Sequence, residues 1–219
     1  MKKKYTIIII LLLIGLIGFY VYYNMKYSLE NILKLLPFES GLPNNAYIEE
    51  EHFDNVSEKV DLKVKTYIKD NIVYIYQDGK EQLYNFNNGK LLFILHASKE
   101  ITYFSIGELD KEYILTNGFN YEGLKEYTNQ YKYLGKEKID DKIYIKFSIT
   151  GDNIKEIYYL DVENKYISKI ENYRIDNNEY KLETTINYKY LYNVVKDEDI
   201  LKFDSDNYPD YIVQGEINE

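Results

Sequence analysis

Histidine and cysteine, which often carry acid–base or metal chemistry, are scarce in this chain. It has two histidines, His52 and His96, and no cysteine. His52 lies in the acidic stretch EEEHFD at residues 49–54, where an imidazole and several carboxylates could hold a metal ion. The alternative, which we favour, is an exposed polar edge strand. His96 closes a predicted strand and faces a turn, so neither histidine predicts a metal site.

The other catalytic patterns are incomplete or absent from the sequence. Asp204 and Asp206 begin like a calcium-binding loop, but Tyr208 stands where the third ligand belongs and the loop glycine is missing. The sequence contains no glycine-flanked nucleophilic serine and no phosphate-binding loop. We therefore expect a protein that is not an enzyme and that needs no metal and no cofactor.

The elements that would position a binding site begin with an apolar run at the N-terminus. The 21 residues from Tyr5 to Met25 carry no charge, and a helix of this length spans roughly 30 Å, the thickness of a bilayer core. Lysines at positions 2–4 favour a cytoplasmic N-terminus. A cleaved signal peptide is the alternative, but its apolar part is shorter and small residues follow it, whereas aromatic residues at 19–23 end this run.

The sequence therefore predicts two parts. Residues 1–26 are a basic cytoplasmic start and a single-pass membrane anchor through residues 5–25, and residues 27–219 are an extracytoplasmic domain. That domain contains all 36 acidic residues and 23 of the 27 basic ones, which leaves it with a net charge of −13. Such a charge excludes nucleic acid as a partner. A cysteine-free extracytoplasmic domain is typical of bacteria rather than of animal secretion.

After a short helix at residues 28–36, the apolar period changes from helical to two. In residues 59–69 apolar side chains alternate with charged ones, which is typical of a half-buried strand. Asp78-Gly79 is a strong hairpin signal. The strands at 72–76 and 91–95 are apolar on both faces, so a second layer must cover them.

The central and C-terminal regions complete the predicted architecture. Helical patterns at 108–116 and 120–130 could supply the covering layer, and strands return from residue 142, the longest at 179–192. A single sheet of this many strands must curl. We expect a mainly β (α+β) domain: one strongly curved antiparallel sheet, or half-open β-barrel, of about eleven strands, with helices on its concave side and a transmembrane helix before it.

Three short motifs in the last third resemble a known family. They are DDKIY at 140–144, YLDVEN with ISKI at 159–170, and the closing strand with its tail at 188–203. Together with the order of elements over residues 28–214, they resemble the bacterial lipoprotein carriers of the LolA/LolB type. The resemblance implies a half-open barrel whose apolar groove holds acyl chains. The predicted tether departs from these carriers, which are released proteins or lipoproteins, so a shuttle is not expected.

Two functions are compatible with this fold. The first is a membrane-anchored, non-catalytic binding protein whose groove takes a lipid, a lipidated protein or an apolar peptide. The second is a structural or protein-interaction domain of a cell-envelope assembly, with a filled core and no small ligand. The residues expected to line the groove, if they do not simply fill the core, are Tyr74, Tyr76, Phe93, Leu95, Tyr103, Ile145, Phe147, Tyr188 and Tyr190.

Overall fold

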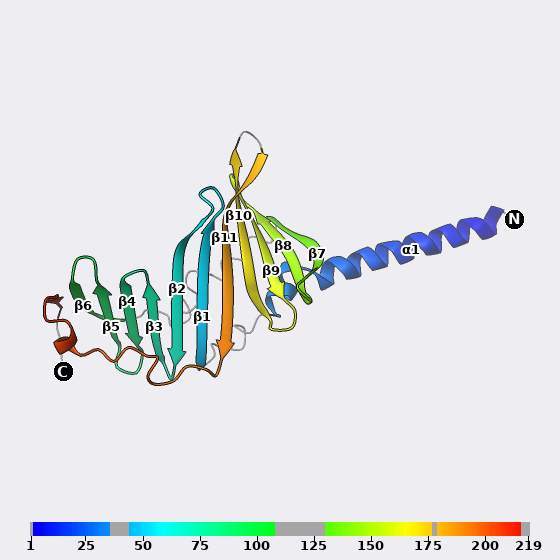
Figure 1. Ribbon diagram of the computed structural model, residues 1–219. Helices are drawn as coiled ribbons and strands as arrows, with labels where there is room; N and C mark the ends of the chain where they lie inside the picture. The colour runs from blue at the N-terminus through cyan, green and yellow to red at the C-terminus, as the bar shows by residue number, and fades with distance from the viewer. Residues whose placement is uncertain (1, 36–43, 108–129, 177–178, 216–219) are drawn as a thin grey trace.

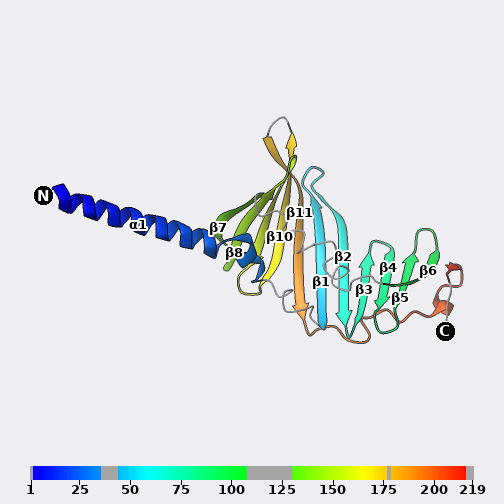
Figure 2. The ribbon, with the colours of Figure 1, turned by 180° about the vertical axis from the view of Figure 1, so that it is seen from behind.

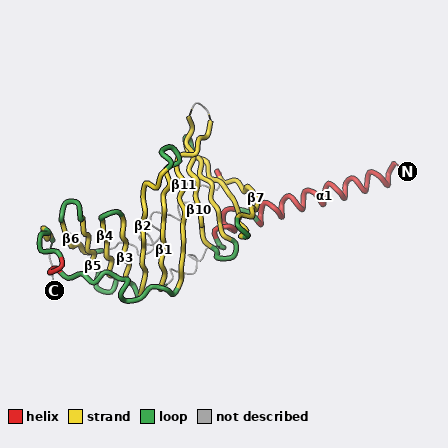
Figure 3. The backbone as a smooth tube through the Cα atoms, viewed as in Figure 1, coloured by secondary structure: helices red, strands yellow, loops and turns green. Residues whose placement is uncertain are grey.

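A twelve-stranded sheet forms the body of the protein, and an N-terminal helix projects away from it (Figure 1). The computed structural model describes residues 2–35, 44–107, 130–176 and 179–215, with side chains from residue 12 onwards. Strands dominate this described part of the chain (Figure 3). The helices predicted at 108–116 and 120–130 lie outside it, except for residue 130.

The sheet consists of two antiparallel meanders that meet at its centre. The first contains β1 (Asn45–Asp54), β2 (Lys59–Lys69), β3 (Ile72–Gln77), β4 (Lys80–Asn85), β5 (Lys90–Leu95) and β6 (Glu100–Ser105). The second contains β7 (Tyr131–Ile139), β8 (Lys142–Thr150), β9 (Ile154–Asp161), β10 (Tyr166–Asp176) and β11 (Glu179–Tyr192). The pairing of β1 with β11 joins the two meanders.

A short C-terminal strand, β12 (Ile212–Gln214), completes the order β12-β6-β5-β4-β3-β2-β1-β11-β10-β9-β8-β7. β12 runs parallel to β6, whereas the other strand pairs are antiparallel. The sheet curves without closing, and β7 and β12 are its edges (Figures 1 and 2). A mainly β, strongly curved, non-closed sheet was predicted, and the structure confirms it.

The interpretation of residues 49–54 as an edge strand was wrong. They belong to β1, which lies in the centre of the sheet between β2 and β11. Their acidic sequence is compatible with this place because Glu50, which is buried, pairs with His52 on the same strand face. Because both side chains are polar, the sequence does not indicate that this pair lies inside the sheet.

Two helices precede the sheet: α1 (Lys2–Lys26) and the short α2 (Leu29–Leu33). Ser28 caps α2, since its side chain accepts a hydrogen bond from the Asn31 backbone N–H. Among the residues with described side chains, no helix combines the length and the apolar character needed to cross a membrane.

α2 covers one face of the second meander. Its Leu29, Ile32 and Leu33 side chains are buried against a cluster that contains Ile145, Phe147, Tyr158 and Leu160. We call this side of the sheet the α2 face and the other side the outer face. Because strand side chains alternate between faces and directly paired residues share one, the strand registers assign each residue to a face.

Candidate functional site

The nine residues predicted to line a groove do not share one face of the sheet. Ile145, Phe147, Tyr188, Tyr190, Phe93 and Leu95 lie on the α2 face, as the registers of their strands show. Tyr74, Tyr76 and Tyr103 lie on the outer face, in register with Leu83 and Leu92. The nine residues therefore cannot form one groove, although ligand binding by either subset stays a prediction.

The outer face of the doubly apolar strands is covered by a later part of the chain. On the outer face Leu92, Ile94 and Ile101 are buried beneath residues that follow β11, among them Phe203 and Tyr211. We expected the helical patterns at 108–116 and 120–130 to supply the covering layer, and a cover by the C-terminal segment was not predicted. The aromatic residues Phe203, Tyr208 and Tyr211 were the feature of the sequence from which this cover could have been predicted.

On the α2 face, the second meander is filled by side chains. Phe147 has no exposed surface, and its ring stacks on Tyr158 with the centroids 4.9 Å apart and the planes inclined by 3°. Leu33 of α2 packs into the same cluster. Ile145 and Phe147 are therefore core residues of the protein, and a ligand could reach them only by displacing α2.

Tyr188 and Tyr190 lie nearer the centre of the sheet, on β11. They pair with Glu50 and Ile48 of β1, and the Tyr190 ring centroid is 4.6 Å from that of Tyr166. Burial is the main cause that raises the pKa of both tyrosines above the ordinary 10.0, and Glu50 and neighbouring phenols add to it. These phenols stay neutral at physiological pH and act as apolar rings with a polar tip.

An open pocket of about 530 Å³ lies where α1 joins the domain. We call it the α1 pocket. It is lined by Tyr23, Asn24, Tyr27, Ser28, Leu29 and Glu30 from the helices and by Tyr131, Lys132, Tyr133, Leu134 and Gly135 from β7.

The tyrosines of the α1 pocket hold one another in place. The rings of Tyr27 and Tyr133 stack with centroids 4.2 Å apart and planes inclined by 8°, and Tyr23 contacts both rings at 4.8 and 5.7 Å. The Tyr131 hydroxyl donates a 2.6 Å hydrogen bond to the Tyr27 carbonyl oxygen. Burial is the main cause that raises the pKa of Tyr131 and Tyr133. The pocket is thus a pre-formed aromatic surface with neutral hydroxyl groups.

One cation lies beside the rings of the α1 pocket. The Lys26 ammonium is 5.8 Å from the Tyr22 ring centroid and 5.6 Å from that of Tyr27. Lys132 also belongs to the lining, but it pairs with Ser148 and so lies on the other face of β7 from Tyr131 and Tyr133. β7 changes register between Tyr133 and Gly135, a bulge for which Gly135 adopts φ +112°. Rings, an apolar side chain and the Lys26 ammonium together suit an amphiphile with an anionic or zwitterionic end.

Sequence reasoning did not select the α1 pocket. It assigned Tyr131 to a helical pattern, whereas Tyr131 and Tyr133 alternate on β7 and face the same side. The available signal was the four-residue spacing of Tyr23 and Tyr27, which places both rings on one side of a helix. Tyr23 and Tyr27 meet Tyr133 across about a hundred residues of sequence, and no local sequence pattern predicts such a contact.

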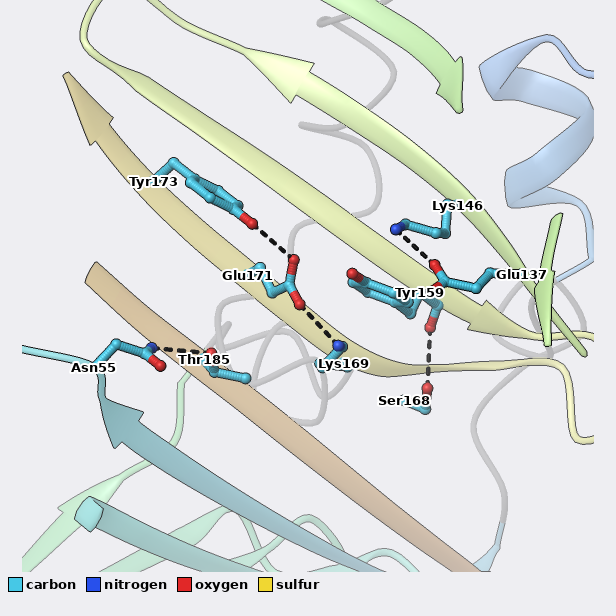
Figure 4. Close-up of polar contacts among 9 residues, drawn as sticks. All are labelled: Asn55, Glu137, Lys146, Tyr159, Ser168, Lys169, Glu171, Tyr173 and Thr185. Atoms are coloured by element: carbon cyan, nitrogen blue, oxygen red, sulfur yellow. Dashed lines mark hydrogen bonds and ion pairs between the residues drawn. The ribbon is translucent and has the colours of Figure 1, made fainter. Parts of the chain in front are cut away.

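The outer face of the second meander presents a polar network (Figure 4). The Lys169 and Lys146 ammonium groups lie 3.8 and 4.7 Å from the ring centroid of Tyr159. Glu171 accepts hydrogen bonds from Lys169 at 2.7 Å and from the Tyr173 hydroxyl at 3.0 Å. Burial acts to raise the pKa of Glu171, but the hydrogen bonds from Lys169 and Tyr159 outweigh it and the pKa is lowered. These groups satisfy one another, which is what a structural network requires.

Both histidines are held by carboxylates. His52 pairs with Glu50, and the His96 Nε2 atom lies 2.6 Å from a carboxylate oxygen of Glu81. In the described ranges no three histidine, aspartate or glutamate side chains gather as a metal site would require. The two histidines are partners of buried carboxylates in this fold.

Comparison with known proteins yields likeness of fold only. The sequence matches no protein-family profile, and no curated protein is detectably similar to it. Solved structures that are similar include a DUF1329 family protein from Desulfovibrio piger, with 14% identity, 80% of this chain and 98% of that chain covered, and a TM-score of 0.40. They also include the Pseudomonas aeruginosa MucA/MucB complex (10% identity, 78% and 60% covered, TM-score 0.42) and PNGF-II (8%, 73% and 30%, 0.34). No sequence match ties the chain to the LolA/LolB-type carriers, and its function has to be inferred from its own residues.

Proposed function

We propose that this protein is a non-catalytic binding protein of the cell envelope, tethered to the membrane by α1, that holds the polar end of a lipid or lipid-modified chain in the α1 pocket. The observation on which this rests is the position of the pocket. Its lining is formed jointly by the last turns of the apolar helix and by the edge strand β7.

The described part of α1 supports the tether. Large apolar side chains project from all around the helix, and those of Leu12, Leu16 and Phe19 are 62%, 64% and 66% exposed. The uncharged run of the sequence begins at Tyr5, ahead of the first described side chain. An exposed apolar helix that packs on no other part of the described chain before its last turns requires a cover, and a bilayer supplies one at low cost.

If α1 spans the bilayer, its end at Lys26 lies at the depth of the lipid headgroups. Tyrosines and lysines are the residues that favour this zone. The α1 pocket then opens beside the headgroups, where a lipid could enter without leaving the membrane. The ammonium group of Lys26 would meet a phosphate or carboxylate, while Tyr27, Tyr133 and Leu134 would contact the start of an acyl chain.

Photo-crosslinking tests this proposal directly. The full chain, reconstituted in phosphatidylglycerol nanodiscs with a diazirine-labelled phospholipid, is irradiated, digested and mapped by mass spectrometry. We expect label on residues 131–135 and a several-fold loss of it in Tyr133→Ala. Tyr180→Ala is the matched control, since Tyr180 is an exposed tyrosine outside the lining of the pocket. Equal labelling of the wild type and Tyr133→Ala would overturn the assignment of the pocket.

The filled core beneath α2 favours a second candidate, an interaction domain that takes no small ligand. Phe147 and Leu160 are fully buried there, and the second meander could serve as a rigid platform for a protein partner. The crosslinking experiment separates the two, because an interaction domain would show no label confined to residues 131–135.

A further inference from the structure

The chain after β11 crosses the ends of the first meander and ends beside β6, where it forms the edge strand β12 (Figure 1). We call residues 196–215 the C-terminal strap. It packs Leu201, Phe203, Tyr208 and Tyr211 on the outer face over Leu92, Ile94 and Ile101. Its last part, β12, adds three residues to the free edge of β6.

The strap is fastened at two points. Just before it, the Asn45 side chain forms two hydrogen bonds with the backbone of Val195, of 2.8 and 2.9 Å. Near its other end, His96 bridges the Tyr211 hydroxyl at 2.8 Å and Glu81 at 2.6 Å. Glu81 is buried and also accepts a 2.7 Å hydrogen bond from Tyr74.

Apart from these points, the ion pair of Lys69 with Asp197 and the packed side chains of Leu201, Phe203 and Tyr208, the strap is loosely held. A pocket of about 320 Å³ lies between it and the sheet, lined in part by Ile72, Leu83 and Leu201. The Lys99–Asp210 ion pair is exposed, with 3.7 Å between charged atoms, and such pairs contribute little. β12 is short, pairs in parallel, and leaves its side chains exposed, with Ile212 at 60%. Poor packing and exposed backbone pairing are the properties of segments that open locally.

We infer that the strap occupies a docking site for an extended segment of a partner protein, which adds a strand to β6 when the strap is displaced. The site specifies the chemistry of this segment. The outer face receives aromatic rings at the places of Phe203, Tyr208 and Tyr211, and the β6 edge receives branched residues. The lysines at 69 and 99, which pair with Asp197 and Asp210 of the strap, select acidic groups beside the rings. Strand addition to a sheet edge is a recurrent mode of peptide recognition.

Gly215 offers a way to open the site without altering the sheet. A Cβ atom at this position would lie 2.5 Å from the Tyr103 carbonyl oxygen of β6, and its φ is +95°. Gly215→Ala should therefore lift β12 from the edge. Gly89→Ala is the matched control, because Gly89 also has a left-handed φ, +68°, but has no atom within 4 Å of the added Cβ.

The test uses the full chain and a fluorescent peptide with the sequence of the strap, residues 196–215. We expect Gly215→Ala to bind this peptide about tenfold more tightly, or more, than the wild type or Gly89→Ala, because a larger fraction of the protein has an open edge. Tyr211→Ser, which removes the bond to His96, should act in the same direction. Hydrogen exchange at residues 100–105 should be faster in Gly215→Ala and slow down when the peptide binds.

Equal affinity of the wild type and both opened variants would overturn the inference. Dimerisation of Gly215→Ala, measured by light scattering, would show that the opened edge of β6 binds a second copy of this chain. It would overturn the inference that the edge binds a different protein. None of these results bears on lipid labelling at the α1 pocket, so the two proposals fail separately.

Discussion

Phe147→Ala tests whether the cluster beneath α2 is the stabilising core of the domain. Phe147 is fully buried, stacks on Tyr158, and has the Tyr131 ring centroid at 5.7 Å. Removing a buried phenylalanine side chain costs about 3–5 kcal/mol through lost burial and the remaining cavity. This is a large part of a total stability of roughly 5–15 kcal/mol. For a domain of this size it corresponds to a fall in the melting temperature of about 6–20 °C.

The assay is thermal unfolding followed by circular dichroism in detergent, with Phe104→Ala as the matched control. Phe104 is 50% exposed on β6, so the same substitution should cost less than about 1 kcal/mol there. If both variants melt within a degree or two of each other, the cavity estimate is wrong and the cluster does not stabilise the domain. Such a result would also reopen the space under α2 as a ligand groove.

Three further predictions follow from other parts of the fold. The buried carboxylate of Asp161 accepts hydrogen bonds from two backbone N–H groups in the turn after β9, so Asp161→Ala should cost about 1–3 kcal/mol in urea unfolding, while Asp152→Ala at an exposed turn should be nearly neutral. The pKa of Glu171 is lowered in the folded protein, so the stability that its carboxylate contributes is complete above the ordinary pKa of 4.5 and is lost as the pH falls below it. Glu171→Gln should therefore lose less stability than the wild type when the pH is lowered from neutral to acid. Equal losses of stability in the two proteins would show that Glu171 does not contribute in this way. Mass spectrometry of the membrane fraction should find peptides with the intact N-terminus, and finding only chains that start near residue 24 would end the anchor interpretation.

The turns and the strands beside them were predictable because their determinants are local. Asp78-Gly79 joins β3 to β4, as predicted, and both residues have positive φ, at 29° and 79°. Asp140 and Asp141, which the resemblance placed in a turn, likewise have positive φ between β7 and β8. A short polar side chain or a glycine tolerates the left-handed conformation, so such dipeptides indicate two-residue hairpins.

The pairing of distant segments was not predictable on the same basis. The sequence predicted one curved antiparallel sheet but not its strand order, in which β1 pairs with β11 at the centre and β7 lies at one edge. The acidic stretch of β1 gave no alternation from which a central strand could be recognised. Its polar side chains become acceptable only when the partner strands and the Glu50–His52 pair are in place.

Binding residues were as hard to predict from the sequence as the pairing of distant strands. The groove residues were selected for being apolar on strands, which is also what a core requires, so Ile145 and Phe147 proved to be core. The α1 pocket and the strap instead consist of tyrosines whose rings are partly covered by segments far away in sequence, such as Tyr27 by β7 and Tyr211 by the end of β5. A chain with 27 tyrosines can leave such rings at half-buried positions because their hydroxyl groups keep hydrogen-bond partners there. Binding surfaces in this protein are therefore better sought where tyrosines from distant segments meet at an edge of the sheet than where a strand is apolar on both faces.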